Sequence, residues 1–175
     1  MALAKQNFST NAEEAINQQI EVEQTASQTY QAIAAWFARD NVALPGLAAF
    51  FQKQSQEESK HAQLLINYQN MRGGRVILNN VPQPETEWTS AKNAVESSLE
   101  LEKAVNKSLL NLTSLAEDQN DHQLGNFLKQ IFLVEQVQSI EELAKMVTQL
   151  NRVGGDGLGL HLWDQELLKN GKIAV

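Results

Sequence analysis

Residues 54–62 read QSQEESKHA, which places Glu58 and His61 three positions apart inside a long helical pattern. Side chains three residues apart in an α-helix lie on one face. That face is otherwise apolar, with a stripe formed by Leu47, Phe50, Phe51, Leu65 and Tyr68. A carboxylate and an imidazole in such a stripe need a partner, and a metal ion is one such partner. Taken alone, the motif favours a solvated or mutually paired Glu58 and His61, because both residue types usually lie at protein surfaces.

The bulk composition excludes several classes of function. The 175 residues are enough for one domain with a sizeable core, and we expect residues 1–175 to form a single domain. The formal net charge of -7 argues against nucleic acid as a partner. The absence of cysteine excludes disulfides, zinc-thiolate sites and thiol nucleophiles. The chain has no apolar run of membrane-spanning length and no signal-peptide core at its start, so we expect no membrane association and a cytoplasmic location.

Two helices surround the motif. The first is expected from Thr10 to about residue 39, starting with a capping box at residues 10–13. Its inner stripe contains Glu23 and Tyr30, although Glu23 by itself could be solvated. The second helix is expected from Pro45 to about residue 71, before two glycines. The short link between the two helices makes them antiparallel neighbours.

Residues 75–90 form a long connection in which Pro82 and Pro84 exclude a helix. A helix of about 27 residues is about 40 Å long at ~1.5 Å per residue. About sixteen extended residues can reach about 50 Å at ~3.3 Å each. The connection can therefore run the length of the helices, so that the third helix starts at the same end as the second. The sequence predicts an all-α four-helix bundle with one long crossover loop between helices two and three.

The remaining chain supplies three more helices. The third is expected at about residues 91–119, with Glu102 as the polar residue in its apolar stripe, although Glu102 could also belong to a surface ion pair with Lys103. The fourth continues to about residue 153, which gives a bundle over about 10–153, and places Gln136 near its apolar stripe. A short fifth helix at about residues 158–169 cannot stand alone and must dock on its own bundle or on a second subunit.

Polar residues in the expected core lie at one depth of the bundle. Glu23, Glu58 with His61, and Glu102 come from three helices, each near mid-length and facing inward. Tyr30, Glu57 and Gln136 lie close to the same level. Carboxylates with an imidazole and no thiol suit iron or another first-row divalent metal. Several polar side chains at matching depth favour a metal site of the di-iron bundle type over coincidence.

At this point the sequence also resembles a known family, eukaryotic-type ferritin, and specifically its heavy, ferroxidase-bearing subunit. The resemblance extends from about residue 6 to about residue 168. The matching segments include Gln18-Gln19-Ile20, Glu23, Phe37-Ala38-Arg39-Asp40, Val42-Ala43-Leu44, Gln54-Ser55, Glu57-Glu58, Lys60-His61-Ala62, Arg72-Gly73-Gly74-Arg75, Leu101-Glu102-Lys103, Val105-Asn106 and Glu135-Gln136-Val137.

The resemblance implies a ferroxidase centre that binds two iron ions (Fe2+/Fe3+) per subunit. Glu23 and His61 would ligate the first iron, and Glu58 would bridge the two ions. Glu102 would hold the second iron, with Gln136 beside it through water. The activity implied is the oxidation of Fe(II) by dioxygen, followed by storage as ferric oxo-hydroxide mineral.

Further roles follow from the same resemblance. Tyr30 would be bonded to a ligand near the oxygen chemistry, and Glu57 would be a mobile carboxylate that passes iron between the centre and a cavity. The chain would assemble into a 24-subunit shell, as a homo-oligomer or together with other ferritin subunits. Leu158, Leu162 and Glu166 of the fifth helix would face the fourfold pore.

The residues themselves indicate two unequal iron sites. The fourth helix offers no Glu-x-x-His pair. Three residues after Glu135 and Gln136 stand Gln138 and Ser139, and neither is a histidine. The second site therefore lacks a nitrogen ligand, and we expect it to bind iron weakly. A weak site suits iron as a substrate that is oxidised and leaves.

Two departures from the family pattern concern iron transport and mineral growth. Asn126 and Lys129 stand where the threefold channel usually carries acids, so we expect slower iron access unless the lysine pairs with nearby carboxylates or points away from the channel. Lys60 and Gln63 stand where the inner surface is usually acidic, so mineral growth is expected to be less efficient.

Two alternatives differ in class from an iron-storing ferroxidase. A di-iron oxygenase acting on an organic substrate would need a second histidine ligand and a substrate pocket, and neither has a signature here. An inactive structural or storage subunit would be favoured by loss of Glu58 or His61, and both are present. His122 and His161 are expected to be surface residues.

Overall fold

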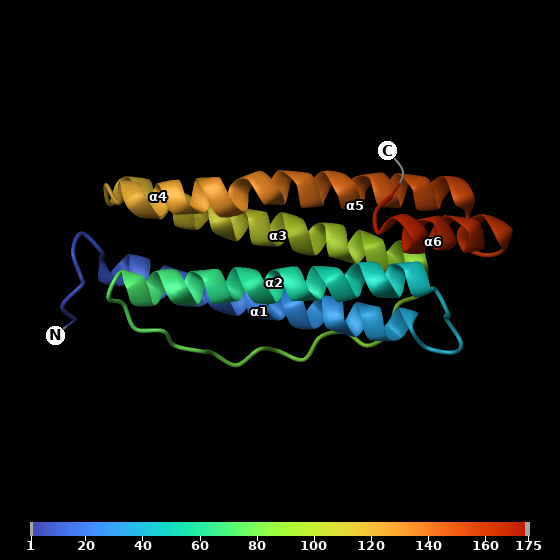
Figure 1. Ribbon diagram of the computed structural model, residues 1–175, viewed down its shortest axis with the longest axis horizontal. Helices are drawn as coiled ribbons and strands as arrows, with labels where there is room; N and C mark the ends of the chain where they lie inside the picture. The colour runs from blue at the N-terminus through green and yellow to red at the C-terminus, as the bar shows by residue number, and fades with distance from the viewer. Residues whose placement is uncertain (1, 174–175) are drawn as a thin grey trace.

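The computed structural model describes residues 2–173, which form an elongated all-helical bundle without a strand (Figure 1). The elements in chain order are α1 Thr10–Phe37, α2 Pro45–Met71, α3 Ala91–Asp118, α4 His122–Leu128, the π-helical turn η1 Lys129–Leu133, α5 Val134–Val153 and α6 Leu158–Asn170. Because α4, η1 and α5 follow one another without a break, they act as the fourth long rod. The predicted four-helix bundle with a short C-terminal helix is confirmed.

The start of α1 differs from the expected capping box by one residue. Ser9 is the N-cap, and its Oγ accepts a hydrogen bond of 3.0 Å from the backbone N–H of Ala12. The Glu13 side chain does not turn back to cap the helix. It accepts a hydrogen bond of 2.7 Å from the backbone N–H of Arg75 instead, so Glu13 ties α1 to the start of the crossover.

The crossover runs along the outside of the bundle beside α1 and α2, as the length argument requires (Figure 1). It leaves α2 through Gly73, whose φ of 76° suits a residue without a Cβ. Asn17 of α1 holds its first part with two hydrogen bonds of 3.0 Å, one to the carbonyl of Arg75 and one from the N–H of Ile77. The loop is therefore extended but anchored by side chains of α1.

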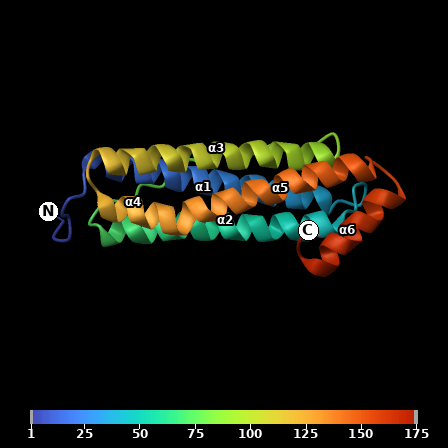
Figure 2. The same ribbon diagram turned by 90° about the horizontal axis from the view of Figure 1, so that it is seen from above.

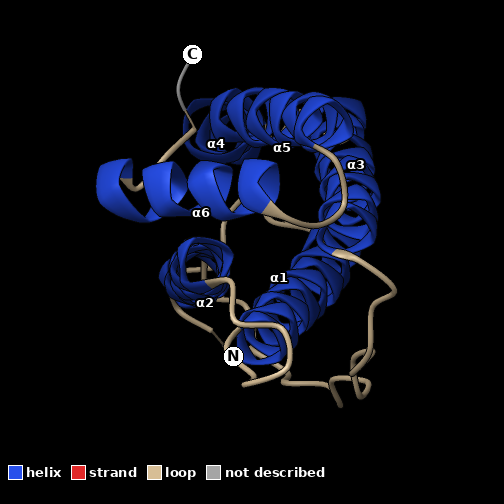
Figure 3. Cartoon of the chain, turned by 90° about the vertical axis from the view of Figure 1, so that its right-hand side faces the viewer, coloured by secondary structure: helices blue, strands red, loops and turns tan. Residues whose placement is uncertain are grey.

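The short helix α6 packs against its own chain, which answers the question that the sequence left open. It lies at an angle across the end of the bundle, in contact with α2 and α5 (Figures 2 and 3). Asp164 is buried and accepts hydrogen bonds from the N–H groups of Gly46 and Leu47 at 3.0 and 2.8 Å. The first turn of α2 has no side-chain cap of its own, so Asp164 of α6 caps α2 from a distance in sequence.

The apolar interior of the bundle is divided into two clusters. One contains Phe37, Phe51 and Leu143 near the α6 end, and the other contains Ile16, Leu65 and Phe132 toward the opposite end. Tyr30 belongs to the first cluster and marks its border with a layer of buried polar side chains. Among the described residues, no helix is long and apolar enough to cross a lipid bilayer.

Candidate metal centre

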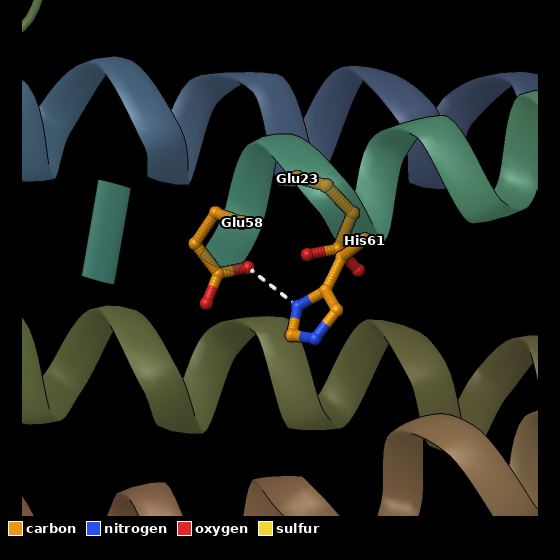
Figure 4. Close-up of side chains that lie close together, drawn as sticks. All are labelled: Glu23, Glu58 and His61. Atoms are coloured by element: carbon orange, nitrogen blue, oxygen red, sulfur yellow. Dashed lines mark hydrogen bonds and ion pairs between the residues drawn. The ribbon is translucent and has the colours of Figure 1, made fainter. Parts of the chain in front are cut away.

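Three ligand groups meet in the polar layer between the two apolar clusters (Figure 4). Glu58 and His61 come from α2, and Glu23 comes from the facing part of α1. One ligand atom from each residue lies within 4.8 Å of the others, and the three residues are buried. The Nδ1 atom of His61 lies 3.2 Å from Oε2 of Glu58. The spacing of three along α2 thus brings imidazole and carboxylate together, on the face that turns toward Glu23.

The donor set suits a divalent cation. Glu23 is fully buried, and its Oε2 has no hydrogen-bond partner. Burial raises the pKa of Glu23 well above its usual value, and the nearby Glu58 carboxylate raises it further. An unpartnered buried carboxylate oxygen is unfavourable. A cation among these groups would satisfy that oxygen and relieve the repulsion between the two carboxylates.

His61 also contacts Glu135, a residue that the sequence did not place in the site. Its Nε2 lies 3.0 Å from Oε2 of Glu135 at the start of α5. Burial lowers the pKa of His61, but the hydrogen bond and charge of Glu58, with Glu135 and Glu23, outweigh burial and raise the pKa to about 9. At neutral pH the imidazolium therefore acts as the positive charge among these acids. A metal ion would take over that role, displacing a proton.

The second half of the layer is built around Glu102 of α3, which is 1% exposed. The hydroxyl of Tyr30 donates to Oε1 of Glu102, and Nε2 of Gln136 donates to Oε2 at 2.9 Å. Burial and the charge of Glu58 raise the pKa of Glu102 to about 7, although the bonds from Tyr30 and Gln136 lower it. Glu102 is therefore close enough to sense Glu58, but it lies outside the three-residue group of Glu23, Glu58 and His61.

The surface alternative for Glu102 is wrong, because Lys103 pairs with Glu100 at 2.7 Å instead. Glu57, in contrast, is only partly buried and lies outside the three-residue group. Its carboxylate contacts Nζ of Lys53 at 3.4 Å and Nε2 of Gln54 at 3.1 Å. Glu57 thus lies next to the centre in sequence but is held by polar neighbours on its own helix.

Comparison with known proteins places the chain, with its fold and its candidate site, in one family. The family profile described as "Ferritin-like domain" matches residues 13–153. The chain is 46% identical over 168 residues to soma ferritin of Lymnaea stagnalis, covering 95% of this chain and 96% of that protein. The chain belongs to the ferritin family. The resemblance drawn from the sequence is confirmed.

Other ferritins resemble the chain to a similar degree. Ferritin heavy chain of Echinococcus granulosus is 46% identical over 173 residues, which cover 98% of this chain and 99% of that protein. The chloroplastic ferritin-3 of Vigna unguiculata is 47% identical, but the match covers only 67% of that longer protein. The chain therefore matches nearly the full length of these two animal proteins and about two thirds of this plant one.

The fourth rod of this ferritin contains a feature that its sequence did not reveal. An uninterrupted helix was expected, but η1 inserts a π-helical turn at Lys129–Leu133, directly before Glu135 and Gln136. A π turn changes the angular register of every residue that follows it, and such turns are frequent at functional sites. Phe132 of this turn is buried with its ring centroid 5.4 Å from that of His61. The π turn therefore lies just before Glu135 and Gln136, the two residues that α5 contributes to the site.

The other histidines of the chain lie outside the centre. His122 and His161 are exposed, as expected from the sequence. His61 is therefore the one histidine that could serve as a metal ligand in the polar layer of the described chain.

Proposed function

We propose that this chain stores iron and acts as a ferroxidase, oxidising Fe(II) to Fe(III) with dioxygen. The observation that carries the proposal is the buried group of Glu23, Glu58 and His61, with ligand atoms within 4.8 Å and an unpartnered oxygen on Glu23. The family supports it, because relatives over nearly the whole chain are named ferritin and ferritin heavy chain. Carboxylate and imidazole donors without thiolate suit iron.

Two iron ions per subunit are bound as substrates in this proposal. Glu23 and His61 hold the first ion, and Glu58 bridges to the second. Glu102 holds the second ion with Gln136 beside it. Tyr30 orients Glu102 through the hydrogen bond that its hydroxyl donates. Each Fe(II) loses one electron, so a pair of ions reduces one dioxygen molecule to the oxidation level of peroxide. Hydrolysis of Fe(III) then releases protons as the mineral forms.

Iron leaves the centre through carboxylates at its edge. Glu57 is partly exposed and pairs with Lys53 and Gln54 of its own helix, not with a residue of the centre, which suits a side chain that swings between the centre and a storage cavity. Lys60 and Gln63 are both exposed on the same helix, so the surface beyond Glu57 carries few acids. We therefore expect less efficient mineral growth, with oxidation retained, and Lys60→Glu with Gln63→Glu should enlarge the cores seen by electron microscopy.

The chain is a single domain that assembles into a 24-subunit cytoplasmic shell, as a homo-oligomer or with other ferritin subunits. Leu158 and Leu162 of α6 are 71% and 54% exposed, which suits a helix whose outer side meets further subunits around a pore. Glu166 is exposed on the same helix. Elution of the assembled protein at the size of a large shell in size-exclusion chromatography would support this assembly, and a monomeric bundle would contradict it.

Iron enters the shell through a channel that is less acidic than is usual in the family. Asn126 and Lys129 lie at the positions expected to line it, and Nζ of Lys129 is 2.5 Å from Oε1 of Glu117. This exposed pair cancels charge within the subunit, so Lys129 repels cations less than a free lysine would. If Lys129→Glu leaves the initial oxidation rate unchanged at low salt, access past this residue does not limit the reaction.

The central test is whether the protein accelerates the aerobic oxidation of Fe(II), followed as the rise of the yellow ferric absorbance. We expect faster oxidation with the protein than without it, and His61→Ala should remove the difference. An inactive subunit would show no acceleration. A centre that binds iron but oxidises an organic compound would show turnover that depends on that compound rather than on Fe(II) supply.

A further inference from the structure

A chain of hydrogen bonds leads from α3 to the metal centre through a residue that is no ligand itself. Gln19 lies one turn before Glu23 on α1 and is 1% exposed. Its Nε2 donates to Oε1 of Glu23 at 2.7 Å. Its Oε1 accepts from Oγ of Ser108, on α3, at 2.6 Å. The path Ser108–Gln19–Glu23 therefore joins two helices and ends on a carboxylate of the centre.

The Glu23 carboxylate, which only accepts, selects the amide nitrogen of Gln19, and the Ser108 hydroxyl anchors the other end of the amide. If the Gln19 amide were reversed, its oxygen would face the Glu23 carboxylate at hydrogen-bond distance, with repulsion between two acceptors. In the orientation present, Ser108 satisfies the amide oxygen, and the amide nitrogen donates to the carboxylate. Glu23 is thus held by one oxygen, and the other, Oε2, has no hydrogen-bond partner.

We propose that Gln19 is a positioning residue of the metal centre, and that Ser108 anchors the far end of its amide. The inference builds on the proposed function. A neutral amide donor restrains Glu23 without placing a positive charge where a cation would bind. Fixing one oxygen in advance reduces the ordering that binding must impose on a buried side chain. Outer partners of this kind commonly alter metal affinity by about 10–100-fold when they are removed.

The test uses four variants of the full-length protein. Gln19→Met keeps the length of the side chain but removes the donor, and Ser108→Ala removes the hydroxyl. Ser108→Thr retains the hydroxyl, and an adjoining cavity of about 330 Å³ leaves room for the added methyl group. Gln18→Met is the matched control, because Gln18 is the exposed neighbour on the same helix.

Two measurements separate positioning from a structural role. Titration with Co2+, followed by its absorption spectrum, should give a dissociation constant about tenfold higher in Gln19→Met and about threefold higher in Ser108→Ala. Ser108→Thr and Gln18→Met should match the unmodified protein. In aerobic oxidation, the Fe(II) concentration at half-maximal rate should rise in the same order, while the limiting rate stays constant.

The outcomes are distinguishable. If Gln19→Met binds Co2+ as tightly as the unmodified protein while its melting temperature falls, Gln19 only ties α1 to α3, and the positioning role is overturned. If Gln19→Met does not fold, the contrast between Ser108→Ala and Ser108→Thr decides. If the unmodified protein itself binds no Co2+ through His61, as judged by His61→Ala, it is the proposed function that fails.

Discussion

The two halves of the metal centre lie in the same polar layer, but they differ in how many of their carboxylate oxygens have a hydrogen-bond partner without metal. Around Glu23, Glu58 and His61, one carboxylate oxygen has no hydrogen-bond partner. Around Glu102, both carboxylate oxygens already accept hydrogen bonds, one from Tyr30 and one from Gln136. The first half therefore gains more from a cation than the second.

The charges of the two halves differ in the same sense. The first half holds two acids and an imidazole whose pKa is about 9, whereas the second holds one acid with a pKa of about 7 and two neutral partners. A cation entering the first half replaces a proton on His61 and meets two carboxylates. A cation entering the second half must compete with existing hydrogen bonds and finds no nitrogen ligand. The comparison supports one tight and one weak iron site in each subunit.

The largest expected effect comes from removing the imidazole. His61→Ala should lower the rate of Fe(II) oxidation by at least about 100-fold, since the loss of a ligand should cost no less than the loss of an outer partner. The rate is measured by the initial increase of ferric absorbance under limiting iron. His122→Ala is the matched control, because His122 is exposed and lies outside the centre. Equal rates for the two variants would remove the distinction between the halves.

The second effect is a dependence of binding on pH. The pKa of His61 is raised to about 9, above its usual value of 6.5, so the metal-free centre holds a proton at pH 7 that the cation must displace. Affinity for Co2+ should therefore increase by about tenfold per pH unit for each proton displaced, and this increase should level off near pH 9. Calorimetry in two buffers of different ionisation enthalpy counts the protons released. Binding at pH 7.5 without proton release would contradict the assigned charge of the first half.

A smaller effect should be confined to the second half. Tyr30→Phe removes a donor that lowers the pKa of Glu102, so the pKa should rise above about 7 and less of the carboxylate should be ionised at neutral pH. The weaker step of the Co2+ titration should then weaken several-fold, while the tighter step stays in place. Tyr68→Phe is the control, because its hydroxyl also donates to a side chain, that of Gln123, in a partly buried hydrogen bond outside the centre. If both steps weaken equally in Tyr30→Phe, the two halves are not separable.

The sequence predicted the helices well, because their ends carry local signals such as Pro45 at the first turn of α2 and Gly73 after its last. It could not predict the π turn or the contact of Glu135 with His61, since both depend on how the fourth rod packs against α2. Gln19 was missed for another reason. A glutamine four residues before Glu23 on the inner stripe was a usable signal, but its role became visible only when α3 placed a hydroxyl beside it.

The smallest expected effect concerns Lys103, the sequence neighbour of Glu102. Lys103 is exposed and pairs with Glu100 at 2.7 Å, whereas Glu102 points into the bundle. Lys103→Ala should therefore change the free energy of unfolding by less than about 0.5 kcal/mol, as is usual for surface ion pairs. Both steps of the Co2+ titration should remain unchanged. A weaker second step in Lys103→Ala would mean that its charge reaches Glu102 from the surface, and the second half would then be less isolated from solvent than its hydrogen bonds indicate.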